Sequence, residues 1–186
     1  TKKDDYYQNA GIEVLYLMPG SPALRAGLKA GEIITAIDGI SVSTLEEYQN
    51  ELLHKFPDSL IKIDCVDRSG KKIKHIVYTQ SRPEKPSNEV YQRDVIENYF
   101  LPLFGMQLRT AGESIGKKNY YVDNVVQNSI ADENGFSAGD KIQISKFKVY
   151  ESENYAMAEI YAKKRKSGYI DIFIRIATML DSSSYF

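Results

Sequence analysis

The chain has 186 residues, and its 24 Lys and Arg residues against 25 Asp and Glu residues give a net charge of -1. This balance argues against proteins that bind nucleic acid or acidic membranes through their overall charge. The single cysteine, Cys65, excludes an internal disulfide bond, and no apolar run is long enough to span a bilayer.

Residues 11–39 predict two strands joined by a short helix. The apolar segment GIEVLYLM begins this stretch as a strand, and Ser21-Pro22 then supplies a helix cap and a first helical residue. Gly27 fits the left-handed conformation that ends a helix. The run EIITAI, residues 32–37, predicts a buried strand, which is closed by the turn signal Asp38-Gly39.

A longer helix is expected from Ser43, which forms the pattern of a capping box with Glu46, to about Lys55. Its apolar face would carry Leu45, Tyr48, Leu52 and Leu53. Residues 59–80, SLIKIDCVDRSGKKIKHIVYTQ, then alternate apolar and polar side chains around a turn, which predicts a β-hairpin. In this pattern Cys65 faces the core as a small hydrophobe and not as a nucleophile.

The run PGSPALRAGLKAGEIITAIDGISVSTLEEYQNEL closely resembles the core of a bacterial PDZ domain. Such domains occur in HtrA/Deg-type serine proteases, site-2 proteases and tail-specific proteases. The shared pattern is small-Pro-Ala-x-x-Ala-Gly-Leu, then Gly-Asp/Glu-x-Ile, then Asp/Asn-Gly, with Glu32 standing where Asp is commoner. The likeness extends over residues 11–80.

A second copy of the pattern begins 108 residues later, where Ser129 corresponds to Ser21. The turn glycines recur as Gly135 and Gly139, because the turn geometry requires them. The copy is weaker, since Lys146-Phe147 replaces the Asp-Gly turn. We expect a second amphipathic helix over about 153–164, followed by the strand GYIDIFIRI, and therefore a tandem repeat.

The copies are separated by residues 80–88, QSRPEKPSN, which have the polar, proline-containing composition of a linker. The run EVYQRDVIENYF, residues 89–100, then predicts a helix that Pro102 ends. This helix would pack against the second copy or, alternatively, mediate dimerisation.

The resemblance implies a mainly β (α+β) fold of two PDZ-like domains in tandem, each a partly open β-barrel or sandwich with two helices. The first PDZ domain is expected at residues 1–80, with its groove strand truncated at the N-terminus. A linker plus a helix would occupy 81–101, and a PDZ-like second domain would occupy 102–186.

As a family, PDZ domains bind peptides by adding a strand to a sheet edge, beside a helix and an apolar-Gly-apolar loop whose N–H groups take the ligand carboxylate. The segment PLFGMQLR would supply that loop and strand in the second domain. The peptide-binding residues so implied are Leu103, Phe104, Gly105, Met106, Gln107, Leu108 and Arg109, with Ala156 and Ile160 on the helix. In the first domain they are Leu45, Tyr48 and Leu52. Without the resemblance, LFGM reads as a turn into a core strand.

The corresponding loop of the first domain would lie upstream of Thr1, so we expect a piece cut from a longer protein. Tyr6 and Tyr7 are interpreted either as a remnant of the groove strand or as a frayed terminus. The terminal Tyr185-Phe186 would dock in a groove of its own or a neighbouring chain, or else form a loose tail.

The remaining motifs do not indicate a nucleotide-binding, metal-binding or catalytic site. The segment AGESIGKK lacks the first Gly and the Ser/Thr of a phosphate loop, and neither His54 nor His75 has a metal ligand at suitable spacing. A nucleophile elbow of the Gly-x-Ser-x-Gly type does not occur in the sequence. We therefore expect no catalytic residue, no metal and no cofactor. The run KKRK at 163–166 reads as a solvated helix end, so no nucleic-acid partner is expected.

Together with the resemblance, these observations predict a non-catalytic tandem PDZ module of a larger, bacterial, trypsin-like serine protease of the HtrA/Deg type. The module would bind peptides or unfolded proteins with apolar C-termini in an extracytoplasmic, periplasmic compartment, and regulate or target proteolysis. The parent protease domain is a second expected partner, and a homo-oligomer would form through the parent protein. The module itself would not enter the membrane, although a segment before Thr1 would anchor the parent.

Two alternatives stay open at this point. The pair could be a structural scaffold with degenerate grooves, or it could belong to a site-2 metalloprotease.

Overall fold

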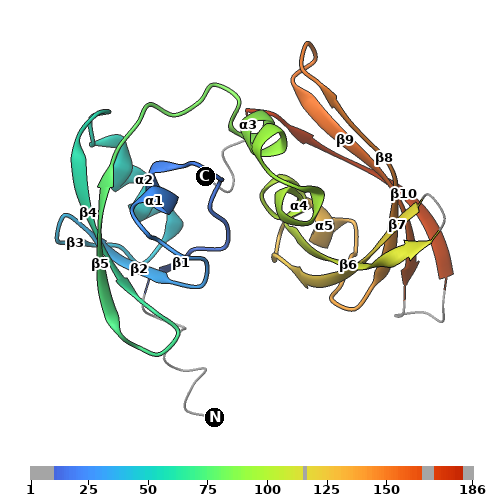
Figure 1. Ribbon diagram of the computed structural model, residues 1–186, viewed down its shortest axis with the longest axis horizontal. Coiled ribbons are helices and arrows are strands. Elements are labelled where there is room, and N and C mark those ends of the chain that lie inside the picture. The colour runs from blue at the N-terminus through green and yellow to red at the C-terminus, as the bar shows by residue number, and fades with distance from the viewer. Residues whose placement is uncertain (1–10, 115–116, 165–169, 182–186) are drawn as a thin grey trace. The chain divides into compact units, whose positions relative to one another are not determined.

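The computed structural model describes residues 11–114, 117–164 and 170–181. The chain divides into two compact units, Thr1–Arg82 and Pro83–Phe186, and each is described by itself (Figure 1). The expectations about Tyr6, Tyr7 and Tyr185-Phe186 lie outside the described residues. Within the described part, no helix is both long and apolar enough to cross a bilayer.

The first unit is a five-stranded antiparallel sheet in the order β1-β2-β4-β5, with β3 paired to β2 (Figure 1). Its elements are β1 (Ile12–Glu13), α1 (Pro22–Arg25), β2 (Ile33–Ile37), β3 (Ile40–Ser41), α2 (Leu45–Leu53), β4 (Leu60–Val66) and β5 (Lys72–Tyr78). The predicted short helix, turn and hairpin are all confirmed. Asp38 and Gly39 both have positive φ, 50° and 90°, as a two-residue hairpin turn requires.

The second unit is a five-stranded sheet in the order β10-β9-β8-β7-β6. Its elements are α3 (Pro86–Arg93), α4 (Ile96–Phe104), β6 (Met106–Ser114), β7 (Lys117–Val125), α5 (Ile130–Glu133), β8 (Lys141–Tyr150), β9 (Tyr155–Lys164) and β10 (Ile170–Met179). The predicted mainly β fold with partly open sheets is confirmed, although the described part of this unit has three helices and not two.

The same backbone hydrogen bonds recur in both units at an offset of 108 residues. The Val14 N–H donates to the Glu32 carbonyl at 2.8 Å, as the Val122 N–H does to the Asp140 carbonyl at 2.9 Å. The Gly31 N–H donates to the Val14 carbonyl at 2.8 Å, as the Gly139 N–H does to the Val122 carbonyl at 2.7 Å. The Leu28 N–H donates to the Ala23 carbonyl at 3.1 Å, as the Phe136 N–H does to the Ala131 carbonyl at 3.0 Å. The repeat read from the turn residues is therefore a repeat of hydrogen bonds.

The capping box of α2 lies one residue later than predicted. Thr44 is the N-cap, and its side chain accepts from the N–H of Glu47, whose carboxylate accepts from the N–H of Thr44 in return. Ser43 adds its N–H and hydroxyl to the same carboxylate at 2.7 and 2.8 Å. Glu46, the expected partner, lies in the first turn without this role because Glu47 is at the third helical position from Thr44.

The single helix predicted over 89–100 is wrong, because two helices occur there. The chain is extended at Asp94, between α3 and α4, and Pro102 lies inside α4 instead of ending it. Leu103 and Phe104 beyond the proline are fully buried. Their packing offsets the loss of one helical hydrogen bond, which otherwise costs about 3 kcal/mol.

The amphipathic helix predicted over 153–164 is also wrong, since residues 155–164 form strand β9. Ala156, Ala158, Ile160 and Ala162 are buried and alternate with more exposed side chains, which is the period of a strand. The basic run KKRK accordingly begins on a strand and not at a helix end.

The predicted altered turn at Lys146-Phe147 is absent, because β8 continues through these residues to Tyr150. Phe147 lies against an aromatic cluster, with ring centroids 5.2 Å from Tyr91, 5.1 Å from Tyr99, 6.0 Å from Phe100 and 6.3 Å from Phe104. Each such pair adds about 1 kcal/mol beyond burial. The cluster therefore fixes α3 and α4 on β8.

Candidate peptide-binding site

Gly105 ends α4 in the left-handed conformation, with φ 76°. Its N–H donates to the Leu101 carbonyl at 2.8 Å, and its carbonyl accepts from the N–H of Val126 at 2.8 Å. A Cβ at this position would lie 2.1 Å from Cβ of Ser129, the N-cap of α5. Glycine is therefore required because α4 approaches α5, and the Gly105 N–H is already used within the protein.

The residues around this glycine are core residues. Leu103, Phe104 and Met106 have no exposed surface, and Leu108 is 5% exposed. Ala156 and Ile160, expected on a groove helix, are fully buried on strand β9. As described, these side chains do not line an open pocket beside β6, and the plain interpretation of LFGM as a turn into a core strand fits this burial.

Gln107 and Arg109, by contrast, are exposed on the other face of β6. The Arg109 guanidinium donates through Nε to Asp123 Oδ1 at 3.1 Å, and it lies 5.3 Å from the ring centre of Tyr121. These contacts hold Arg109 along β7. Its positive charge stays at the surface, where it contributes little to stability.

Among the described strands, β6 lies at an edge of its sheet, and its outward hydrogen-bonding groups can be assigned. Val122 on β7 uses its N–H and carbonyl for Asp140 and Gly139, so both groups point away from β6. Leu108 is the cross-strand partner of Val122, and Thr110 is the partner of Tyr120, two residues before Val122. In an antiparallel ladder such pairs are not hydrogen-bonded to each other. The backbone N–H and carbonyl groups of Leu108 and Thr110 therefore point to the free edge.

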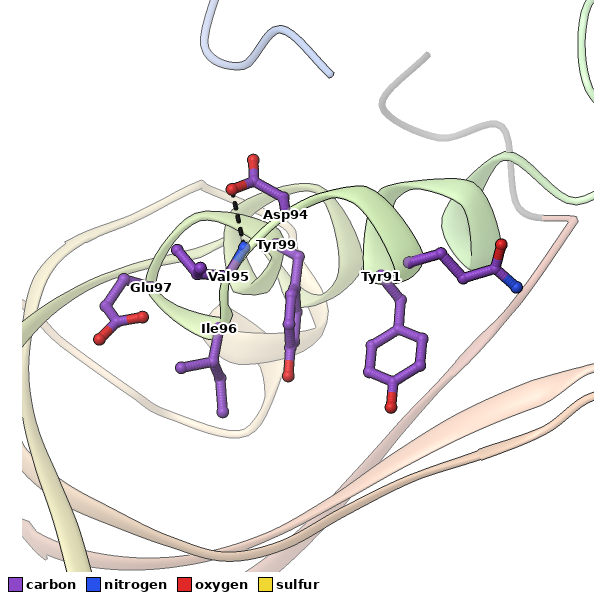
Figure 2. A pocket seen from close by; sticks show the side chains of 7 residues that line it. Tyr91, Asp94, Val95, Ile96, Glu97 and Tyr99 are labelled. Atoms are coloured by element: carbon purple, nitrogen blue, oxygen red, sulfur yellow. Dashed lines mark hydrogen bonds between the residues drawn. The ribbon is translucent and has the colours of Figure 1, made fainter. Parts of the chain in front are cut away.

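A pocket of about 810 Å³ lies at the elbow between α3 and α4. Four of its seven lining residues are aromatic or aliphatic and three are polar: Tyr91, Val95, Ile96 and Tyr99, and Gln92, Asp94 and Glu97. Figure 2 shows Tyr91, Ile96 and Tyr99 projecting from one side of the two helices. Burial raises the pKa of Tyr99, so its phenol stays neutral. Val95 is 58% exposed and available to a ligand.

The pocket adjoins the free edge of β6 through one hydrogen bond. The Thr110 hydroxyl donates to Glu97 Oε1 at 2.8 Å, so Glu97 belongs both to the pocket and to the neighbourhood of the edge. No sequence pattern indicates this pocket, because its residues lie on a pair of helices that the sequence predicts as one helix.

In the first unit, the three implied residues all lie on α2. Leu45 is 45% exposed, whereas Tyr48 and Leu52 are half-buried and pack against the core of the unit. Burial raises the pKa of Tyr48, which keeps its hydroxyl protonated. Of the three, Leu45 is the side chain most open to a ligand.

One cluster of ligand-type side chains was not visible from sequence spacing. Glu32, Cys65 and His75 are buried in the first unit, with their ligand atoms all within 4.8 Å of one another. His75 Nδ1 donates to the Ala26 carbonyl at 3.2 Å, and a second proton lies between His75 Nε2 and Glu32 Oε2, which are 2.8 Å apart. Burial, and to a lesser extent Glu32, raises the pKa of Cys65 to about 12, so its thiol stays protonated. The cluster is thus a buried hydrogen bond between a carboxyl group and an imidazole, beside a thiol.

Two family models match this chain, one in each unit. Residues 13–60 match a PDZ domain model, and residues 87–180, half of the chain, match the TP0546 family PDZ domain. A crystal structure of a PDZ domain protein from Parabacteroides distasonis ATCC 8503 aligns with 95% of this chain and 55% of its own, at 12% identity and a TM-score of 0.36.

Two curated relatives are also similar. One is the periplasmic pH-dependent serine endoprotease DegQ of Escherichia coli, 26% identical over 71% of this chain. The other is a probable periplasmic serine endoprotease, DegP-like, of Chlamydia pneumoniae, 31% identical over 71% of this chain. The chain spans only about a quarter of their lengths, 27% and 26%. With both units matched by PDZ models, the chain belongs to the PDZ family and carries two PDZ domains in tandem.

Proposed function

We propose that the chain is the peptide-binding part of a larger HtrA/Deg-type serine protease. PDZ domains bind peptides and are not catalytic. The observation that carries the proposal is the free edge of β6, where Leu108 and Thr110 direct backbone N–H and carbonyl groups outward beside a half-apolar pocket. An extended peptide would pair with this edge and place side chains toward Val95 and Ile96.

The ligand would be an extended apolar segment of an unfolded protein, at a C-terminus or within a chain. Recognition would rest on main-chain pairing and side-chain contact, because the Gly105 N–H is already donated to Leu101. A terminal carboxylate would then add little. We expect acid and amide forms of one hydrophobic peptide to bind within about threefold of each other, a difference below 1 kcal/mol.

The two relatives support the parent and the compartment. Both are named as periplasmic serine endoproteases, and this chain matches about a quarter of each. We therefore place the chain in an extracytoplasmic compartment, where it would present unfolded segments to a protease domain or regulate that domain.

A proline at the edge tests the binding mode. Thr110→Pro removes the outward N–H, and proline is tolerated on edge strands. Thr110→Val is the matched control, because it removes the hydroxyl bond to Glu97 and retains the N–H. Fluorescence anisotropy with labelled extended peptides should show at least a tenfold loss of affinity for Thr110→Pro only. Equal affinity of the two folded variants would contradict strand addition at β6.

A structural scaffold is the second candidate. It is favoured by one observation, that the second unit has strand β9 where the first unit has helix α2, the element that the resemblance places beside a groove. A scaffold would bind no peptide from a degenerate library, yet would still bind the folded protease domain in a pull-down.

A further inference from the structure

The opposite edge of the second sheet has features of a self-association surface. Strand β10 ends the strand order, and within the described residues no strand pairs with its outer side. The paired region with β9 is ten residues long, and a long open edge favours pairing with another strand. This edge is distinct from β6, so the inference does not depend on the proposed peptide site.

One face of the β9–β10 pair is a ladder of cross-strand pairs, exposed except for the partly buried Glu159. Asp171 lies opposite Lys163, Phe173 opposite Tyr161, and Arg175 opposite Glu159. The rings of Phe173 and Tyr161 are 4.8 Å apart and about half exposed, at 46% and 52%. Arg175 Nε donates to Glu159 Oε1 at 3.1 Å, and its guanidinium lies 5.6 Å from the ring centre of Phe173.

We propose that a second copy of this chain pairs with β10 in antiparallel orientation about a two-fold axis at Phe173. This register places Asp171 opposite Arg175 of the second copy, Phe173 opposite Phe173, and, on the other face, Ile172 opposite Ile174. Opposite charges and aromatic pairs directly across an antiparallel ladder are the favourable combinations. The resulting interface is isologous, as a two-fold dimer requires.

The neighbouring registers lack this complementarity. Residues that face each other in an antiparallel pair project from the same face of the sheet. In a self-paired strand the two-fold axis must therefore pass through a residue position, and the nearest alternative registers have the axis one residue earlier or later. An axis at Ile172 puts Asp171 opposite Phe173, and an axis at Ile174 puts Phe173 opposite Arg175. With the axis at Phe173, charges of alternating sign follow one another across the four strands: Lys163 and Asp171 of one copy, then Arg175 and Glu159 of the second copy.

Strand β5, which ends the sheet of the first unit, provides a contrast. Its outward side chains include Lys72 and Lys74, both exposed, together with Ile76 and Tyr78. Charges of one sign cannot complement each other in a self-paired strand, and edge lysines oppose such pairing. The alternating Asp and Arg of β10 therefore distinguish it from a protected edge.

Charge reversal tests the register directly. Asp171→Arg and Arg175→Asp each place like charges opposite one another twice in the dimer. Each should weaken self-association about tenfold or more. An equimolar mixture of the two variants restores opposite charges at both positions, so it should form a 1:1 heterodimer. Sedimentation velocity and native mass spectrometry of the full chain measure both effects.

Lys74→Glu on β5 is the matched control and should leave the wild-type dimer unchanged. A wild-type chain that stays monomeric at the highest accessible concentration would overturn the proposal. A wild-type dimer that either single reversal leaves intact, or a mixture that remains monomeric, would overturn it equally. Circular dichroism of each variant confirms that the chain remains folded.

Discussion

Helix α2 of the first PDZ domain and strand β9 of the second occupy the same place in the repeat. Each follows the second strand of the repeated core, yet one is a capped helix and the other a buried strand. The shared turn, short helix and strand have matching hydrogen bonds in both copies. The repeated core is therefore independent of the element that follows it, which can change without loss of the PDZ core.

Local sequence explains why the two elements differ. Thr44 and Glu47 close a capping box in the first domain, and the matching positions in the second are Ser152 and Tyr155, which cannot form one. Phe147, in the place of the first domain's turn glycine, is held by Tyr91 and Tyr99. This contact between Phe147 and the two tyrosines keeps β8 extended to Tyr150, so the residues that follow pair with β8 as strand β9.

The largest expected effect concerns the close approach that the second domain makes at Gly105, the residue that ends α4. Gly105→Ala combines a positive φ with a Cβ only 2.1 Å from Ser129 Cβ, and should destabilise that domain by roughly 3 kcal/mol or more. Gly39→Ala also has positive φ but meets no atom within 4 Å, and should cost the first domain about 1 kcal/mol. Hydrogen exchange with mass spectrometry reports the two domains separately. Equal losses of stability in the Gly105→Ala and Gly39→Ala variants would contradict the role of the close approach to Ser129.

A smaller effect is expected at equivalent acidic positions. The buried Glu32 carboxyl is hydrogen-bonded to His75 Nε2, so Glu32→Gln should destabilise the first domain by about 2 kcal/mol. Asp140, 108 residues later, instead accepts from the Ser137 N–H at 3.0 Å, and Asp140→Asn should cost about 1 kcal/mol. Urea unfolding measures both. Replacing both partners together, Glu32→Met with His75→Leu, should recover most of the first loss, and failure to recover would contradict the buried pair as its cause.

The smallest effect is a difference in acid sensitivity. The Lys62 N–H and the Lys55 ammonium hold the pKa of Asp38 below its usual value, whereas Lys146 stands at that position in the second domain. A lowered folded-state pKa contributes stability above the unfolded pKa, about 4, and that stability is lost as the pH falls through the folded pKa. The first domain should therefore lose stability below about pH 4, and Asp38→Asn should flatten the dependence. If the stability of the Asp38→Asn variant depends on pH as steeply as that of the wild type, a group other than Asp38 causes the acid sensitivity.

Much of the fold could be predicted because turn residues have few substitutes. Ser21, Gly27 and Asp38-Gly39 fixed the elements of the first domain, and the glycines at the same offset located the second. Residues 155–164 were misread because Ala, Met, Glu and Lys favour a helix, whereas burial on alternate positions decides for a strand. The pocket at the α3–α4 elbow depends on packing around Phe147, which no local pattern encodes.

The most direct measurement is amide exchange by NMR on the full chain, with and without an extended apolar peptide. If the peptide pairs with β6, the amides of Leu108 and Thr110 should gain protection, since they point to the free edge. The amide of Arg109, which faces β7, should change little. Binding that leaves Leu108 and Thr110 unchanged would contradict strand addition at this edge.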